Sequence, residues 1–269
     1  MDLHSLLRTG FDGHPAADFD DILYGVYEDP RHRDRVLPLT ALMNDEAASA
    51  MNRFLACVVL TTWAEPAGYE AVLRAAADSR NAPWYDVSVD RKFSVDSTFA
   101  QLADALGSGE ELAEEKGNAQ LRTEALRALV RIADTEYFEE KLEGALHGAA
   151  LAALLPDIEE TVLRGVRALG PGRRIRFDLA TQLVDLACAI ALVDAPRAIA
   201  LAERVIAADP DHRVLVHATT VVARAEGEER RRLAGRLLAG GDEEIRRLVA
   251  EAVRAADHSE VREGETGTV

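Results

Sequence analysis

Cysteine and long apolar runs are scarce in this chain. Only two cysteines occur among its 269 residues, Cys57 and Cys188, and both lie within apolar segments. Two cysteines so placed provide neither a disulfide framework nor the spacing of a zinc site, so we expect two buried free thiols. The longest apolar run, 186–193, is much shorter than the roughly 20 residues that a membrane-spanning helix needs.

Signals for export are also lacking at the start of the chain. The opening stretch, MDLHSLLRTGFDGH, has neither a basic beginning nor the apolar stretch of a signal peptide. We therefore expect a cytoplasmic protein. Residues 1–16 contain two glycines and a proline and predict a loose N-terminal arm, while the polar residues 257–269 predict a disordered tail.

Positive charge is in short supply. The chain has 31 lysines and arginines against 47 aspartates and glutamates, which gives a formal net charge of −16. Such a field repels phosphate groups and argues against nucleic acid and anionic membranes as partners. The same charge favours a basic protein as partner, although acidic surfaces also keep many proteins in solution without any such role.

Helix-forming residues are what the sequence has in abundance. Hydrophobic residues make up 48% of it and aromatic residues only 5%, so the core is built mainly of alanine, leucine and valine. Alanine, leucine, arginine and glutamate all favour helices, and apolar residues recur at the spacing of a helix face. We expect an all-α protein with helices over 17–27, 33–43, 46–63, 66–78, 97–106, 118–133, 136–154, 157–169, 177–192, 196–208, 212–225, 228–238 and 242–256.

Several residues mark the expected boundaries. Pro38 falls inside one predicted helix as a kink, and Pro156 is expected to separate two others. Asn44 and Asp45 are expected to cap the helix that follows them. The acidic stretch 110–115 lies between glycines and is expected to bridge two helices.

Two segments share one pattern, Asn118–Leu129 and Asp242–Val253. Each begins with a capping residue, has an aliphatic residue three positions later and then an arginine, Arg122 or Arg246. This pattern resembles the second helix of a HEAT-type repeat. The resemblance implies an α-solenoid of about six antiparallel helix pairs, each pair burying its second apolar face against its neighbours.

The resemblance has further consequences for residues 17–256, which we expect to form a single repeat domain. In HEAT-like repeats, aspartates and arginines of successive repeats tend to pair along the inner row of helices. Asp242 and Arg246 would belong to such a ladder. The segment 195–215 is similar to the junction of two tetratricopeptide helices, so tetratricopeptide-like repeats are the second choice.

Sequence motifs of catalysis are not found. None of the seven histidines belongs to a metal-binding motif, and His212 and His217 are five residues apart, a spacing that does not place both on one helix face. Adjacent glutamates on a helix diverge by about 100°, so the pairs at 139–140, 159–160, 228–229 and 243–244 are not acid–base dyads by spacing. We expect no catalytic residues, no metal and no cofactor, and the question of enzymatic activity stays open.

The least helical stretch of the chain, 79–95, gathers aromatic and basic residues in a protein that is poor in aromatic residues. Loops on a rigid scaffold often bind partners, and tryptophan, tyrosine and arginine are typical anchors of protein interfaces. Alternatively, its aromatic residues only cover the core. The predicted partner-binding residues are Trp63, Trp84, Tyr85, Arg91, Lys92 and Phe93.

Composition, charge and this loop together favour a non-catalytic scaffold or adaptor that binds a protein partner. An inhibitor or immunity-type protein directed against a basic toxin is one specific form of this hypothesis. The HEAT resemblance also implies an alternative, because that family includes DNA glycosylases and lyase-type repeat proteins. The net charge of −16 opposes the DNA glycosylase. The oligomeric state does not follow from the sequence.

Overall fold

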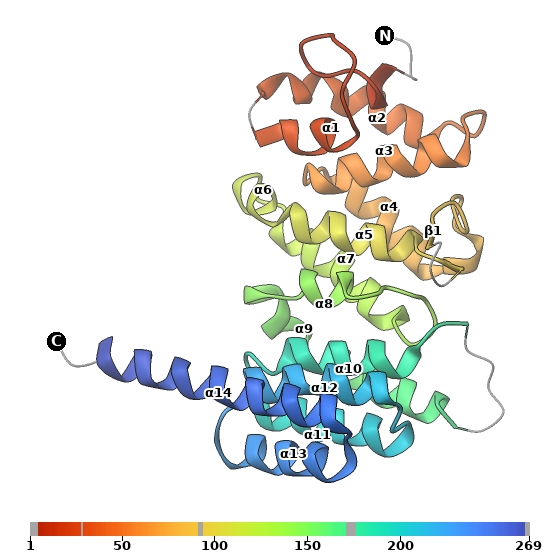
Figure 1. Ribbon diagram of the computed structural model, residues 1–269. Helices are drawn as coiled ribbons and strands as arrows, with labels where there is room; N and C mark the ends of the chain where they lie inside the picture. Colours follow the sequence, from red (N-terminus) through yellow and green to blue (C-terminus); the bar gives the residue numbers. More distant parts are fainter. Residues whose placement is uncertain (1–4, 28, 91–93, 171–175, 267–269) are drawn as a thin grey trace. The chain divides into compact units, whose positions relative to one another are not determined.

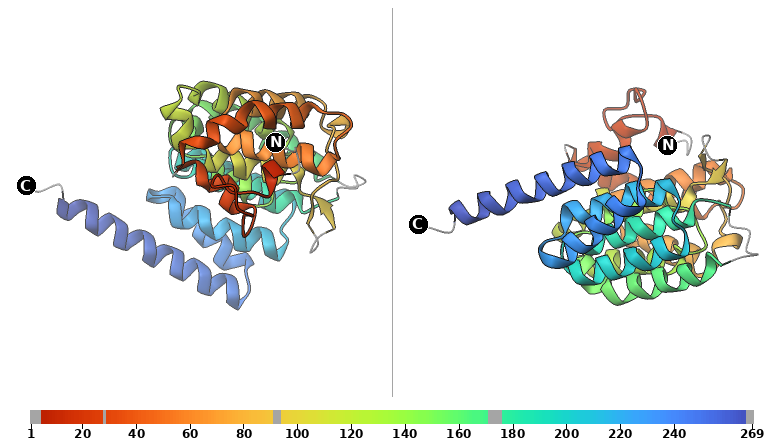
Figure 2. Two further views of the ribbon diagram at one scale, coloured as in Figure 1. Left: turned by 90° about the horizontal axis from the view of Figure 1, so that it is seen from above. Right: turned by 60° about the horizontal axis from the view of Figure 1, so that its bottom comes forward.

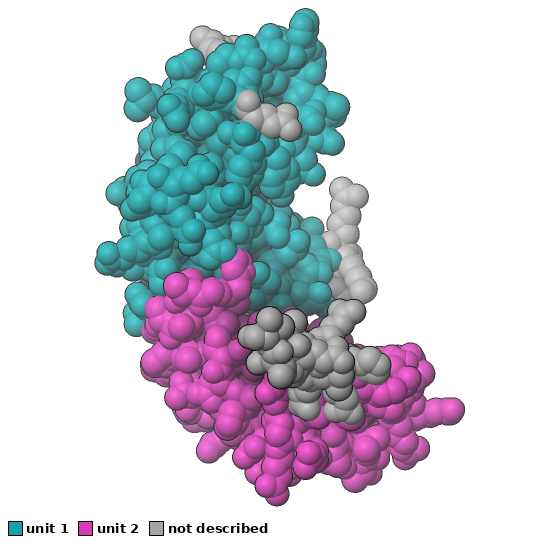
Figure 3. Space-filling view, turned by 90° about the vertical axis from the view of Figure 1, so that its left-hand side faces the viewer, with its two compact units in different colours: residues 1–132, 136–145 teal, residues 133–135, 146–269 magenta. Residues whose placement is uncertain are grey.

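The computed structural model describes residues 5–27, 29–90, 94–170 and 176–266, with side chains described as far as Arg254. Within this part of the chain 73% of the residues are helical, in 14 α-helices and four short 3-10 turns (Figure 1). The prediction of an all-α protein is confirmed. The chain forms two compact units, where the sequence predicts one repeat domain (Figure 3).

Unit 1 comprises Met1–Ile132 and Glu136–Ala145. Its longer helices pack in a regular order: α2 on α3, α3 on α4 and α5, α4 on α7, and α5 on α7 and α8. The helices of unit 1 are α1 (Asp20–Tyr24), α2 (Arg33–Asn44), α3 (Ala50–Thr62), α4 (Pro66–Ala77), α5 (Thr98–Ser108), α6 (Glu110–Glu115), α7 (Ala119–Ile132) and α8 (Lys141–Ala145).

A small hairpin interrupts the helices of unit 1. Strands β1 (Val89–Asp90) and β2 (Val95–Asp96) pair antiparallel, with Val89 opposite Asp96. Within the described residues of 79–95, these short strands and the 3-10 turn Ser79–Asn81 are the regular elements. The hairpin stands between α4 and α5 and closes the loop that carries Trp84.

Unit 2 comprises Ala133–Thr135 and Leu146–Val269. Each helix from α9 to α12 packs both on the helix that follows it and on the one after that. Stacked helical hairpins produce this order of contacts, since each helix touches its own partner and the equivalent helix of the next pair. The helices are α9 (Gly148–Ala168), α10 (Leu179–Ile190), α11 (Ala195–Ala208), α12 (His212–Arg224), α13 (Gly227–Gly240) and α14 (Glu243–Thr266).

Helix α10 is the centre of unit 2. All of its residues from Leu179 to Ile190 are buried, as expected for a helix that is apolar nearly all round. It packs on α9, α11 and α12. At the end of the unit, α14 packs on α12 and α13, and Figure 2 shows its C-terminal half continuing past the other helices of the unit.

Several boundaries differ from the sequence-based expectation, and the helix expected over 136–154 is divided between α8 and the start of α9. Pro156 lies inside the single helix α9, where two helices were predicted. Ser49, not Asn44 or Asp45, caps α3, because its hydroxyl accepts a hydrogen bond from the Asn52 amide. The acidic stretch 110–115 is itself helix α6, and α14 runs beyond the predicted end at residue 256 to Thr266.

The start of the chain is tied to unit 1, although the sequence predicts a loose arm over residues 1–16. Residues Ser5–Leu7 form a 3-10 turn, and Leu6 is fully buried. The guanidinium of Arg35 in α2 donates hydrogen bonds to the carbonyl oxygens of Leu6, Thr9 and Gly10. This buried cation therefore holds the described part of the arm in place.

Candidate functional site

The predicted binding residues of the 79–95 loop lie in different surroundings. Trp84 is only 4% exposed, and its ring lies 6.3 Å from that of Phe54 near the start of α3. Tyr85 is half-buried, and its hydroxyl donates a hydrogen bond to Glu136 at 3.3 Å. Arg91, Lys92 and Phe93 lie outside the described residues.

Trp63, the remaining predicted residue, belongs to another cluster at the opposite end of α3. Its side chain is fully buried, between the rings of Phe11 and His32, and its Nε1 donates to the carbonyl oxygen of Leu23 at 3.0 Å. Core packing thus accounts for Trp63, and the structure does not bring it together with Trp84.

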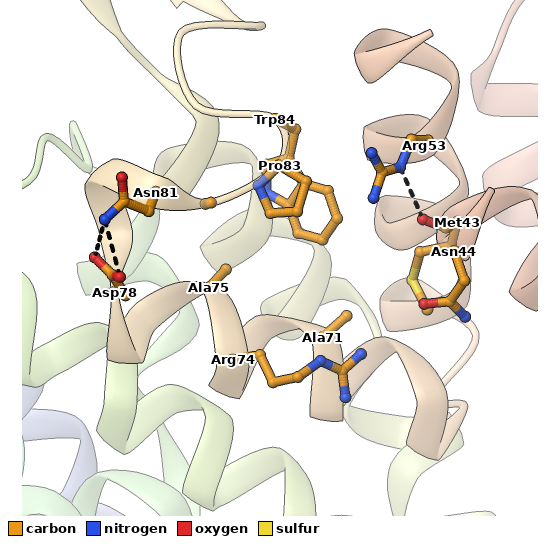
Figure 4. Close-up of a pocket in the computed structure, with 11 residues that line it drawn as sticks. Met43, Asn44, Arg53, Ala71, Arg74, Ala75, Asp78, Asn81, Pro83 and Trp84 are labelled. Carbon is orange, nitrogen blue, oxygen red and sulfur yellow. Dashed lines mark hydrogen bonds between the residues drawn. The ribbon is translucent and has the colours of Figure 1, made fainter. Parts of the chain in front are cut away.

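A pocket of about 210 Å³ lies beside Trp84 in unit 1, at the ends of α2 and α4 and along α3 (Figure 4). Its lining combines apolar side chains with charged and amide groups (Figure 4). The apolar lining consists of Met43, Ala71, Ala75, Ala82, Pro83 and Trp84. The polar lining consists of Asn44, Arg53, Arg74, Asp78 and Asn81.

Two arginines give the pocket its cationic character. Figure 4 shows their guanidinium groups entering from α3 and α4. Arg53 donates through Nε to the carbonyl oxygen of Met43 at 3.2 Å, which fixes the direction of its side chain. Arg74 lies 3.9 Å from Glu70, in an exposed pair of a kind that contributes little to stability.

The single carboxylate among the lining residues is already engaged. Both oxygens of Asp78 accept hydrogen bonds from the Asn81 amide, at 3.1 and 3.0 Å. No carboxylate pairs with Arg53 in the described part of the chain. The lining therefore holds two guanidinium groups whose capacity to donate hydrogen bonds is largely unused.

Trp84 contributes a further donor. Its indole Nε1 is buried, and it has no hydrogen-bond partner among the described residues. Buried polar groups are nearly always hydrogen-bonded, so an orphan donor calls for an explanation.

A second polar cluster holds the loop in place through hydrogen bonds to Glu136 and Asp96. Glu136 accepts hydrogen bonds from the hydroxyls of Ser79, at 2.5 Å, and of Tyr85. Burial raises the pKa of the Asp96 carboxyl. The backbone amide and the hydroxyl of Thr98 donate hydrogen bonds to this carboxyl and partly offset the rise. These contacts hold both ends of the loop, so the position of Trp84 is defined by the fold.

Unit 2 contains a histidine–carboxylate pair that the sequence analysis missed. Nδ1 of His217 in α12 lies 2.6 Å from Oδ1 of Asp185 in α10, and both side chains are largely buried. The signal was Asp185, a charged residue inside an otherwise apolar helix. Such a pair orients an imidazole, and here it joins two stacked helices.

The cap-and-arginine pattern has different outcomes in its two copies. Arg122 is buried and donates to the carbonyl oxygen of Leu106 and to Glu110, whereas Arg246 is exposed. Asp242 caps α14 by accepting from the Ile245 amide, but its other described partner is His212 and not an arginine. The Asp–Arg ladder implied by the resemblance is not formed by Asp242 and Arg246.

In the described part of the chain, no three histidine, cysteine, aspartate or glutamate side chains are grouped so that they could hold a metal ion. None of the helices in that part combines the length and apolar character needed to cross a membrane. Comparisons with protein-family models, with curated proteins and with solved structures find no match to this chain.

Proposed function

We propose that this chain is a non-catalytic adaptor that binds a protein partner, and that its helices form a HEAT-like repeat array. The observation that carries the binding role is the pocket beside Trp84, where an aromatic residue, two arginines and an apolar wall meet. Aromatic residues and arginines are the side chains most often found at energetically important positions of protein interfaces.

The size of the pocket supports a partner rather than a cofactor. Its volume of about 210 Å³ is below the roughly 300–1,000 Å³ of typical small-molecule and cofactor sites. A single side chain projecting from another protein needs less room. The pocket is thus suited to one anchoring residue, with the surrounding surface of the partner resting on the neighbouring helices.

The repeat architecture is supported by the contacts within unit 2. Each helix from α9 to α12 packs on the next and on the next but one, as in a stack of helical hairpins. In unit 1 the order α3–α5 and α4–α7 follows the same principle. Repeat arrays commonly serve as binding scaffolds, because their stacked helices provide an extended surface.

The test begins with the purified full-length chain as bait in an extract of its own cells. Each protein captured is then purified and titrated against the chain by calorimetry. We expect a saturable binary complex with a fixed stoichiometry. The proposal fails if no captured protein forms such a complex, or if a captured candidate turns out to be a substrate that the chain converts chemically.

Salt dependence addresses the charge of the partner. A basic partner would be steered by the field of this acidic chain, and its association rate would fall steeply between about 50 and 300 mM salt. Stopped-flow measurements at both salt concentrations are expected to show this fall. A rate that is independent of salt would mean that the net charge of −16 has no role in partner choice.

A further inference from the structure

We infer that the pocket beside Trp84 receives a glutamate side chain of the partner protein, with its carboxylate held between Arg53 and Arg74. This inference rests on the proposed partner-binding function and specifies the chemistry of its anchor. It follows from three features of the pocket: its unused donors, its apolar wall and its size.

The donors call for an acceptor that carries negative charge. Guanidinium groups form their strongest hydrogen bonds with carboxylates, which accept at both oxygens. Arg53 is held in place by the carbonyl oxygen of Met43, and Arg74 has only an exposed glutamate 3.9 Å away. A carboxylate between the two arginines would therefore gain bonds without displacing a strong internal partner.

The indole of Trp84 lines the pocket and reports on its occupant. Its Nε1 is buried, so a bound carboxylate changes the Nε1 signal through the ring and not by direct contact. A lysine or arginine anchor would bring only donors, and it would face two like charges at short range.

The apolar wall selects glutamate over shorter acids. Met43, Ala71 and Ala75 are almost fully buried and lie beside Trp84. The two methylene groups of a glutamate can pack against this wall while its carboxylate reaches the arginines. An aspartate has one methylene fewer and gains less from the same surface.

The overall charge of the chain does not oppose this anchor at short range. Charges further away than about 10 Å are largely screened at 0.1 M salt, so the groups that line the pocket decide what enters it. The charged residues of the lining are two arginines and one aspartate, and the carboxylate of that aspartate accepts a hydrogen bond from Asn81. Glu70 lies 3.9 Å from Arg74 but outside the lining, and it offsets part of this positive charge.

The experiment uses the full-length protein labelled with nitrogen-15. The chain has only two tryptophans, so its spectrum contains two indole N–H signals. Trp84→Phe identifies the signal of Trp84, and the signal of the hydrogen-bonded, fully buried Trp63 serves as internal reference. The probes are the blocked peptides Ac-Ala-Glu-Ala-NH2 and Ac-Ala-Gln-Ala-NH2, which differ only in the charge and acceptors of one side chain.

We expect the glutamate peptide to move the Trp84 signal in a saturable manner, with a dissociation constant of about 1 mM or tighter. The glutamine peptide should leave it unchanged. Arg53→Gln and Arg74→Gln should each weaken binding about tenfold. Arg80→Gln, an exposed arginine outside the pocket lining, is the matched control and should have no such effect.

Several outcomes would overturn the inference. These are equal responses to both peptides, no response to either, or an equal loss of binding with Arg80→Gln. If only a peptide with a free C-terminal carboxylate, Ac-Ala-Ala-Leu, gives a response, the pocket binds the C-terminus of a chain and not a glutamate side chain. If a partner is captured and its affinity is unchanged by Arg53→Gln and Arg74→Gln, the adaptor role stands and only the inference about the pocket fails.

Discussion

At the scale of single residues, the two tryptophans show how similar side chains take different roles. Both are buried in unit 1, but the indole nitrogen of Trp63 donates to the carbonyl oxygen of Leu23, while that of Trp84 has no described partner. Removing a satisfied donor leaves its acceptor without a bond. Removing an unsatisfied donor does not carry that cost.

Trp63→Phe is therefore expected to lower the free energy of unfolding more than Trp84→Phe, by about 1–2 kcal/mol. Both substitutions remove the same volume, so each is the control for the other. Urea denaturation followed by circular dichroism measures the difference. Equal losses of stability would show that packing, and not the bond to Leu23, decides the cost.

Asp96 gives the loop a dependence on pH. Burial raises the pKa of its carboxyl, the nearby Asp86 and Glu136 raise it further, and hydrogen bonds from Thr98 oppose the rise. Because the folded state binds this proton more tightly than the unfolded state, the contribution of Asp96 to stability declines as pH rises through the raised pKa.

Asp96→Asn removes the negative charge of the carboxylate and keeps an oxygen that can accept the hydrogen bonds from Thr98. The variant is expected to be more stable than the wild type at about pH 7 and equal to it once the carboxyl is protonated, at about pH 3. Urea titrations at both pH values measure this. A variant that is less stable at neutral pH would contradict the reasoning.

Some residue-level features were predictable and others were not. Both cysteines are buried free thiols, and burial raises the pKa of Cys57 to about 12, as their apolar surroundings imply. Trp84 was predicted to belong to a binding site, yet its orphan nitrogen and its proximity to Arg53 depend on how α3 meets the loop. No local sequence pattern encodes a contact of that kind.

At the scale of secondary structure, Gly68 marks the closest approach of two helices. A Cβ atom at this position of α4 would lie 2.5 Å from the backbone nitrogen of Thr61 and 2.7 Å from the carbonyl carbon of Leu60. Real contacts are never so short, and the atoms met are backbone atoms. The pairing of α3 with α4 therefore requires glycine here.

Gly68→Ala is expected to destabilise unit 1 by about 1–3 kcal/mol, because the two helices must move apart. Gly144→Ala is the control. Gly144 also lies in a helix of unit 1, but nothing stands within 4 Å of the position of its Cβ atom, and its replacement should be neutral or slightly stabilising. Urea denaturation compares the two, and similar losses would disprove the role of Gly68.

The positions of the helices were largely predictable from apolar spacing, whereas several of their ends were not. Pro156 was expected to break a helix, but Pro156 and Ala152 one turn before it both face solvent in α9. Water can satisfy the carbonyl group that the proline leaves unpaired. The stretch 110–115 forms a helix because Leu112 and Ala113 are buried while Glu110 and Glu111 stand at its N-terminus.

At the scale of the whole molecule, each unit has its own core and its own buried cysteine. Cys57 lies in α3 of unit 1 and Cys188 in α10 of unit 2. A buried thiol reacts only after its surroundings open. The two cysteines are therefore natural reporters of the opening of the two units.

Thiol labelling along a urea gradient is expected to leave both cysteines unmodified in the native protein. In Gly68→Ala, the urea midpoint of Cys57 labelling should fall while that of Cys188 stays in place. Mass spectrometry of the labelled peptides distinguishes the two sites. If both midpoints fall together, the units unfold as one cooperative body.

The different number of neighbours around each helix of unit 2 has a consequence for hydrogen exchange. Helix α10 is buried along its whole length and packs on α9, α11 and α12, whereas the main contacts of α14 are with α12 and α13. Amide hydrogens of α14 should thus exchange with deuterated solvent first, followed by those of α13, with α10 slowest. Such a gradient would make the last helix the place where this unit begins to come apart.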